Sequence, residues 1–304
     1  MKFFKKRESV VENLAFMGVS AALVGLFALA SSFSVIASIL LMLALPLLSA
    51  LVAIICKWRY LPLFLIASIG VSTLLSFASF QNEIFFVIPS LFIGIVFGML
   101  ERTKIERAIS LFLCALMEFG LFYLSMLFIK GLYEVDMIQF LLQLIGRKID
   151  GVSEIIFPTF VLGYAFAQVA ILDFAFYFVF SRFGMNRKYQ FLKPFYCWIG
   201  IASYFLSLGL SLINPTLGYL FLGISIYWTV FALVYFFQKP CKLGIILIVI
   251  GIFTALLISS LMYKMMPPNT GLILYGSVFA IANIGCFMGH LVQKKASKEH
   301  QGAQ

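Results

Sequence analysis

Apolar stretches long enough to cross a lipid bilayer repeat along almost the whole chain. An α-helix rises about 1.5 Å per residue, so about 20 apolar residues cover the hydrocarbon core. No stretch shows the alternation of polar and apolar residues that membrane β-strands require. We therefore predict an all-α, polytopic transmembrane helix bundle of about ten spans, or eight if two short segments are re-entrant. The predicted spans are residues 14–31, 34–56, 61–80, 84–100, 108–129, 155–180, 195–213, 216–237, 243–263 and 271–292.

The composition agrees with lipid as the solvent of most side chains. Of the 304 residues, 63% are hydrophobic and only 11% are charged, and the mean hydropathy is +1.07. An ordinary soluble domain has about 25% charged residues. The lipid bilayer is thus the expected partner, and the segments outside the spans are too short for a separate soluble catalytic domain.

The basic residues are distributed unevenly between the two sides of the predicted bundle. One side carries 18 Lys and Arg residues, and the other side carries 4. Positively charged loops stay in the cytoplasm, so both termini are predicted to be cytoplasmic, in a bacterial cytoplasmic membrane. The formal net charge of +10 is then explained by topology and anionic headgroups, and no nucleic-acid partner is expected.

One integral membrane domain is predicted over residues 1–304. It divides into an N-terminal half, an external segment, a C-terminal half and a cytoplasmic tail, at residues 1–129, 130–154, 155–292 and 293–304. Apolar residues recur in the external segment at steps of three and four, with polar residues on the opposite face. This pattern predicts an amphipathic helix on the outer surface, which either connects two spans or covers a pocket.

Two acidic residues, Glu118 and Asp173, fall inside predicted spans. An ionised carboxylate costs several kcal/mol at mid-membrane, and no Lys or Arg lies inside any predicted span to pair with it. Helix rise places both acids and Asn283 at similar depth, about 12–16 Å from the cytoplasmic helix ends. We predict one buried polar layer, with Gln168 and Asn283 as hydrogen-bonding neighbours. The two acids are then either protonated packing residues or a substrate, cation or proton site, and they cannot both stay ionised.

Small residues recur at four-residue steps in two predicted spans. The first span contains Gly18 and Ala22, followed by Gly25, and the fourth contains Gly94 and Gly98. Such spacing lets helix backbones approach closely. These residues are predicted to serve helix packing within the chain or, alternatively, docking of a partner protein.

Several chemical functions lack their sequence signature. The chain has no phosphate-binding GxxxxGK[ST] loop and no HExxH metal motif. Its five cysteines form no CxxC pair, and none lies in a predicted external loop, so they are expected to be packing residues. We expect no catalytic residues, no metal, no cofactor and no ATPase activity of the chain itself, and an enzyme is not the favoured interpretation.

A family resemblance rests on short segments at several predicted span ends. They are residues 12–15, Pro46 ahead of residues 57–59, Pro89 leading through Gly94 and Gly98 to residues 101–102, and residues 182–184 leading through residues 193–195 to Trp198. The chain resembles the YybS-like family of uncharacterised bacterial membrane proteins and, more distantly, the substrate-binding subunits of energy-coupling-factor transporters. The resemblance implies a small-molecule-capture fold that uses ATPase and coupling subunits as partners.

Three functions follow as expectations. The first is a transporter or small-molecule-capture subunit, which the buried acids and the resemblance favour. The second is a structural or regulatory scaffold for envelope or division proteins, with the small residues and basic loops as contact surfaces. The third, a lipid-modifying enzyme, is disfavoured because no cluster of metal-binding carboxylates stands at an interface.

Overall fold

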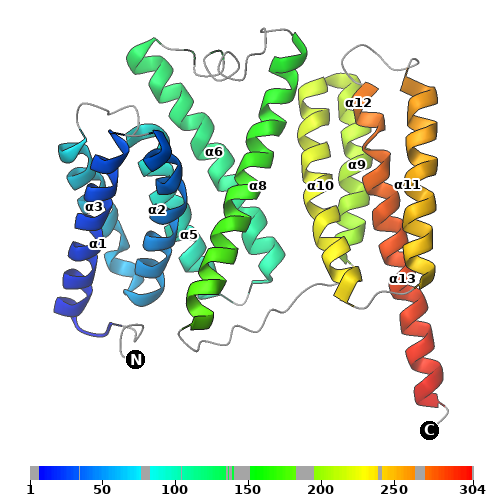
Figure 1. Ribbon diagram of the computed structural model, residues 1–304, viewed down its shortest axis with the longest axis horizontal. Coiled ribbons are helices and arrows are strands. Elements are labelled where there is room, and N and C mark those ends of the chain that lie inside the picture. Colours follow the sequence, from blue (N-terminus) through cyan, green and yellow to red (C-terminus); the bar gives the residue numbers. More distant parts are fainter. Residues whose placement is uncertain are drawn as a thin grey trace. The chain divides into compact units, whose positions relative to one another are not determined.

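The chain is an all-helical protein in the computed structural model, and its described secondary structure contains no strand. The described residues are 7–33, 35–76, 83–103, 105–134, 136, 139, 151–182, 195–238, 242–263 and 271–302. The principal helices (Figure 1) are α1 (Val10–Ser31), α2 (Val35–Ile55), α3 (Leu61–Leu75), α5 (Ile88–Glu101), α6 (Arg107–Tyr133), α8 (Gly151–Arg182), α9 (Phe195–Ile213), α10 (Pro215–Gln238), α11 (Lys242–Met262) and α13 (Ser277–Gly302).

Nine helices in the described part of the chain are long and apolar enough to cross a membrane. A further apolar stretch, Leu43–Ile55, belongs to α2. The predicted fold class is therefore confirmed, and the chain is a multi-pass membrane protein. Most of the predicted external segment lies outside the described residues. Helix α13 continues to Gly302, into the segment predicted as a tail.

The helices form two compact units. The first unit comprises Met1–Arg147 with Tyr164–Tyr189, and the second comprises Lys148–Gly163 with Gln190–Gln304. Helix α8 contributes to both of them. Whether the units act as one membrane domain stays a prediction.

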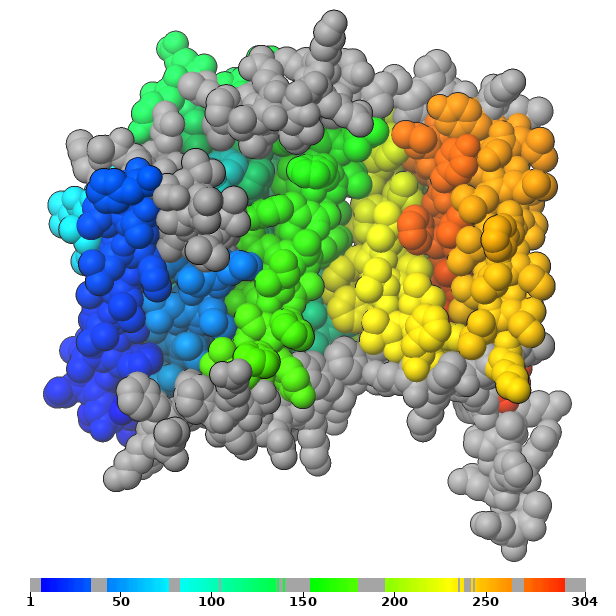
Figure 2. Space-filling view, in the orientation of Figure 1, coloured from blue at the N-terminus to red at the C-terminus, as the bar shows by residue number. Residues whose placement is uncertain are grey.

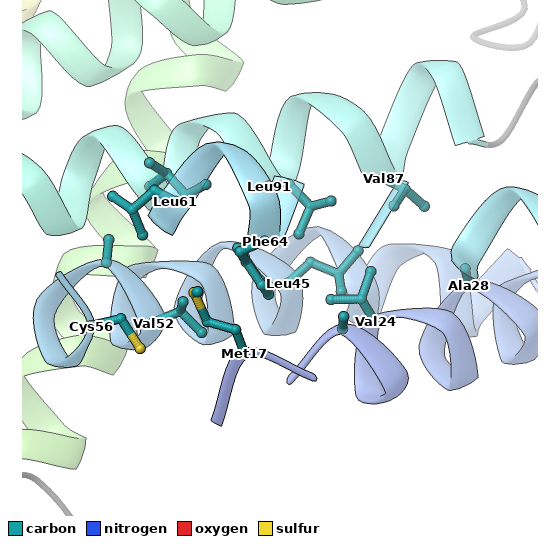
Figure 3. Close-up of a cluster of buried hydrophobic side chains, with 13 residues drawn as sticks. Met17, Val24, Ala28, Leu45, Val52, Cys56, Leu61, Phe64, Val87 and Leu91 are labelled. Carbon is teal, nitrogen blue, oxygen red and sulfur yellow. The ribbon is translucent and has the colours of Figure 1, made fainter. Parts of the chain in front are cut away.

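The core of the first unit lies between α1, α2, α3 and α5. Figure 3 shows side chains from all four helices in this cluster, among them Val24, Val52, Phe64 and Leu91. Helix α1 begins where the Ser9 hydroxyl accepts a hydrogen bond from the Glu12 backbone N–H, at 3.1 Å. This N-cap satisfies a backbone donor that the first helical turn would otherwise leave unpaired.

Glycines permit the closest helix contact in the first unit, between α2 and α5. A Cβ atom added at Gly94 would lie 1.9 Å from the Ser49 Oγ and 2.2 Å from the Pro46 carbonyl oxygen. At Gly98 it would lie 2.6 Å from the carbonyl oxygen of Ala50. Both positions thus require glycine, and Gly94 and Gly98 pack against α2 within the chain.

The second unit is built around a tight helical hairpin of α9 and α10. The Asn214 carboxamide oxygen accepts hydrogen bonds from the backbone N–H groups of Thr216 and Leu217, at 2.9 and 3.4 Å. The predicted last span is interrupted, because α12 (Gly271–Leu274) ends in a turn before α13 begins. The Ser259 hydroxyl donates a hydrogen bond to the Leu274 carbonyl at this break, at 2.8 Å. A side chain thereby satisfies a backbone group near the break in the helix.

The outer faces of the helices are strongly apolar. Figure 2 shows α11 (orange) at the surface, and its exposed side chains include Ile246, Ile250, Phe253 and Leu257. Exposed apolar residues in this number are costly in water and favourable in lipid. The surface therefore agrees with a lipid environment.

Candidate functional site

Acidic side chains are buried in the first unit at three places. Glu83 and Glu118 are buried, with 1% and 3% of their surface exposed, and the Asp173 side chain is 14% exposed. A buried carboxylate must be paired, hydrogen-bonded or protonated, because desolvation penalises its charge. The three acids meet this requirement in different ways, and that difference selects the candidate site.

Glu118 lies on the buried face of α6. Cys114, Ala115 and Ser125 are buried on the same helix, four, three and seven residues from Glu118. The Oε2 atom of Glu118 has no hydrogen-bond partner in the part of the chain that the structure describes. Glu118 is therefore a buried acid with unused hydrogen-bonding capacity.

Aromatic contacts hold part of α8 against α6. The rings of Phe112 and Phe166 stack at 5.9 Å, and those of Phe122 and Tyr164 lie 6.0 Å apart. Tyr164 is also close enough to Glu118 for a Coulombic interaction. Gln168 is one turn further along α8 and is buried. The α6–α8 interface thus presents an acid, a phenol and a carboxamide in one apolar region.

Asp173 differs from the sequence prediction. Its carboxylate forms an ion pair with the Arg107 guanidinium, which also pairs with Glu101. The Arg107 guanidinium lies 4.7 Å from the centre of the Phe97 ring. The prediction that no cation pairs with the two acids is wrong for Asp173, because Arg107 is the first residue of α6 and its side chain turns into the bundle.

The same ion pair removes the reason for a proton shared between Asp173 and Glu118. Asp173 already has a counter-cation, and eleven residues of α6 separate Arg107 from Glu118, about 16 Å of helix rise. The Arg107–Asp173 pair connects the turn between α5 and α6 to α8. Asp173 is therefore better explained as a structural residue. Among the described residues, Glu118 has no ion-pair partner, and its Oε2 atom has no hydrogen-bond partner.

Glu83 was missed by the sequence prediction, which began the fourth span one residue later. Its carboxylate accepts hydrogen bonds from the hydroxyls of Ser72 and of Ser76, the latter at 3.2 Å. Ser68 and Ser72 of α3 and Ser76, its C-cap, recur every four residues, and this row of polar residues on a predicted span is a signal for a buried polar partner. Two hydroxyl donors satisfy Glu83.

A π-helical turn, η4 (Glu83–Val87), precedes α5. The Ser125 hydroxyl of α6 donates a hydrogen bond to its Ile84 carbonyl, at 2.9 Å. The Phe85 ring lies 4.6 Å from the Phe122 ring, one turn beyond Glu118 on α6. Turns of this type occur frequently at functional sites. Here the turn also packs next to the α6 face that carries Glu118.

Asn283 lies in the second unit, fully buried. Its amide donates hydrogen bonds to the Thr229 hydroxyl at 2.7 Å and to the Phe279 carbonyl at 3.0 Å. Gly200 leaves room for the side chain, since an added Cβ would lie 2.5 Å from the Asn283 Nδ2. Asn283 therefore links helices within its own unit, and its role as a neighbour of Glu118 stays a prediction.

The small residues of α1 divide into two groups. Gly25 faces α3, where an added Cβ would lie 2.6 Å from the Val71 Cγ1. Gly18 has no atom within 4 Å of such a Cβ, and Ala22 is exposed. Gly25 is thus used in packing within the chain, whereas Gly18 and Ala22 face outward.

No group of three His, Cys, Asp or Glu side chains that could hold a metal ion occurs among the described residues. Comparisons of the chain with protein-family models, curated proteins and solved structures give no match. The functional interpretation therefore depends on the geometry around Glu118.

Proposed function

We propose that this multi-pass membrane protein is a transporter or small-molecule-capture subunit whose binding site includes Glu118. The observation that carries the proposal is the burial, at the α6–α8 interface, of a carboxylate with one oxygen that has no hydrogen-bond partner among the described residues. A carboxylate in this setting gains most from a proton, a metal cation or the amino group of a ligand. Tyr164 and Gln168 offer hydrogen-bonding groups on the facing helix.

The proposal extends to location and partners. The 18-to-4 distribution of basic residues supports a bacterial cytoplasmic membrane with both termini in the cytoplasm. Energy would come from a proton or ion gradient or from separate ATPase and coupling subunits. The resemblance to transporter subunits supports the second source.

A ligand screen by thermal stability tests the proposal. The purified chain is heated in detergent with metal cations, organic amines and cationic vitamins, one class at a time. A ligand at 100 times its Kd stabilises the folded state by about 2.7 kcal/mol. We expect one class to stabilise the wild type and Glu154→Gln, an exposed control, but not Glu118→Gln.

A second substitution separates binding from packing. Glu118→Leu replaces the carboxylate with an apolar side chain of similar size. If Glu118 has only a structural role, the protein should tolerate this substitution. Equal ligand stabilisation of the wild type, Glu118→Gln and Glu118→Leu would contradict the proposed site. Loss of stabilisation in both variants, with normal melting in the absence of ligand, would support it.

A scaffold is the second candidate function, because Gly18 and Ala22 face outward on α1 instead of packing within the chain. An exposed small-residue face lets another membrane helix approach closely. Pull-downs in mild detergent with the wild type and Gly18→Leu distinguish the two functions. Capture of ATPase subunits supports transport, and capture of envelope or division proteins that Gly18→Leu abolishes supports the scaffold.

A further inference from the structure

A basic pocket opens at one end of the first unit, away from Glu118 along the helices. Its volume is about 460 Å³. We define the basic pocket by Arg7, Lys57, Arg59 and Arg102, and the acid Glu8 and Trp58 also line it. These residues come from the start of α1, the segment after α2 and the end of α5. Three parts of the chain that are distant in sequence therefore place four cations around one cavity.

The walls of the basic pocket are fixed by a buried amide. The fully buried Asn13 donates hydrogen bonds to the carbonyls of Arg7 at 3.2 Å and Ser9 at 2.7 Å. Its carbonyl oxygen accepts a hydrogen bond from the Lys57 backbone N–H, at 2.9 Å. The backbone N–H of Arg7 also donates a hydrogen bond to the Ile55 carbonyl, at 3.1 Å. The start of α1 is thus tied to the end of α2 before any ligand arrives.

Among the described residues, none of the four cations of the basic pocket forms an ion pair within 4.0 Å of an Asp or Glu oxygen. Arg102 instead donates to the carbonyls of Ile54, at 2.7 Å, and Cys56. Lys57 donates to the Glu8 carbonyl, at 2.7 Å. Carbonyl groups accept hydrogen bonds but neutralise no charge, so the four cations outnumber Glu8, the one acid among the described lining residues, and the pocket keeps a net positive charge.

Two further groups beside the basic pocket favour the binding of an anion. The Arg7 Nε is buried and has no hydrogen-bond partner in the described part of the chain. Burial raises the pKa of the Cys56 thiol to about 11, although Arg102 and Arg7 oppose this shift. The thiol is therefore neutral at physiological pH and supplies no counter-charge. Burial also lowers the pKa of Arg102, an effect that a bound anion would reverse.

The basic pocket lies at the ends of the membrane helices. Helices α1 and α3 begin beside it, and α2 and α5 end beside it. Trp58 is 71% exposed there, and Arg59 lies 4.8 Å from the Tyr60 ring centre. Exposed Trp and Tyr residues are typical of the level of lipid headgroups. An anion at this level is most readily supplied by the membrane itself.

We propose that the basic pocket binds the phosphate group of an anionic phospholipid. Guanidinium groups suit phosphate because their planar donors match two phosphate oxygens at once. Basic pockets between membrane helices commonly hold anionic headgroups. Arg7 and Arg59 contribute donors to the phosphate, and Arg102 contributes charge while it holds the end of α2. This site is separate from Glu118 and does not depend on the proposed transport function.

Lipid titration of the purified full chain, followed by native mass spectrometry, tests the site. Phosphatidylglycerol and phosphatidylcholine with identical acyl chains are added in turn. We expect the wild type to prefer phosphatidylglycerol, and Arg7→Gln and Arg59→Gln each to weaken its binding roughly fivefold. Lys242→Gln removes one exposed charge outside the pocket and is the matched control, with unchanged binding expected.

The source of the phosphate and the soundness of the fold are tested in parallel. Displacement of the bound lipid by millimolar inorganic phosphate would assign the pocket to a free phosphate group, and retention would assign it to the lipid headgroup. Arg59 is exposed, so Arg59→Gln is expected to fold even if Arg7→Gln does not. Equal binding of both lipids by the wild type, or binding by Arg59→Gln equal to that by Lys242→Gln, would overturn the proposal.

Discussion

The two units bury different kinds of polar group. In the first unit, Glu83, Glu118 and the Arg107–Asp173 pair are buried or nearly so. In the second unit, the buried polar side chains among the described residues are all neutral: Ser203, Ser207, Ser211, Ser225, Thr229, Ser259 and Asn283. Neutral groups can be satisfied by short hydrogen bonds between helices, whereas charges need partners or ligands. Among the described residues, the buried acids therefore lie in the first unit, whereas the buried polar side chains of the second unit join its helices.

The difference also concerns how much each polar contact contributes to stability. Removing one partner of a buried ion pair leaves a charge in a medium that solvates it poorly. Removing a neutral hydrogen bond in a membrane helix costs little, because the remaining group finds another partner. Substitutions in the two units should therefore differ in their effect on unfolding.

The largest effect is expected for Asp173→Asn. It leaves Arg107 buried with Glu101 as its one remaining carboxylate partner among the described residues, and the free energy of unfolding should fall by about 3 kcal/mol. Thermal and denaturant unfolding in detergent measure the loss. The triple variant Asp173→Asn with Arg107→Gln and Glu101→Gln removes all three charges of this cluster and should recover part of it. If the triple variant is less stable than Asp173→Asn, the loss does not come from an unpaired buried charge.

A smaller loss is expected for Gly94→Ala. The new Cβ would clash with Ser49 and with the Pro46 carbonyl, so α2 and α5 must separate, at a cost of about 2 kcal/mol. Gly120→Ala is the matched control, since a Cβ at Gly120 meets no atom within 4 Å. The two melting temperatures in one detergent give the comparison. Equal melting temperatures would show that the close packing of α2 and α5 is not required for stability.

The smallest effect is expected for Asn283→Leu in the second unit. It removes the hydrogen bond to Thr229, which still donates to the Ser225 carbonyl at 2.7 Å, so the loss should be about 0.6 kcal/mol. The same unfolding measurements apply. If the free energy of unfolding falls as much as it does for Asp173→Asn, the second unit also depends strongly on a buried polar contact. The proposed difference between the units would then be wrong.

The sequence alone determined that this chain is helical and embedded in lipid. Apolar runs of about 20 residues can satisfy their backbone hydrogen bonds in a membrane only as helices, so length and hydropathy suffice for this conclusion. The predicted span 195–213 coincides with α9, and the role of Gly94 and Gly98 in packing was also accessible from their spacing. Glu118 was recognised because a mid-span acid is costly in any arrangement of the helices.

Only the tertiary structure decided how each buried charge is satisfied. The hydropathy pattern predicts a loop at Arg107, yet its long side chain reaches Asp173 on α8, a pairing between residues 66 positions apart. Glu83 became a buried acid because α3 supplies Ser72 and Ser76. The basic pocket likewise joins Arg7, Arg59 and Arg102 through the ends of α1, α2, α3 and α5. Hydropathy is a property of each segment by itself, whereas charge compensation depends on which segments meet.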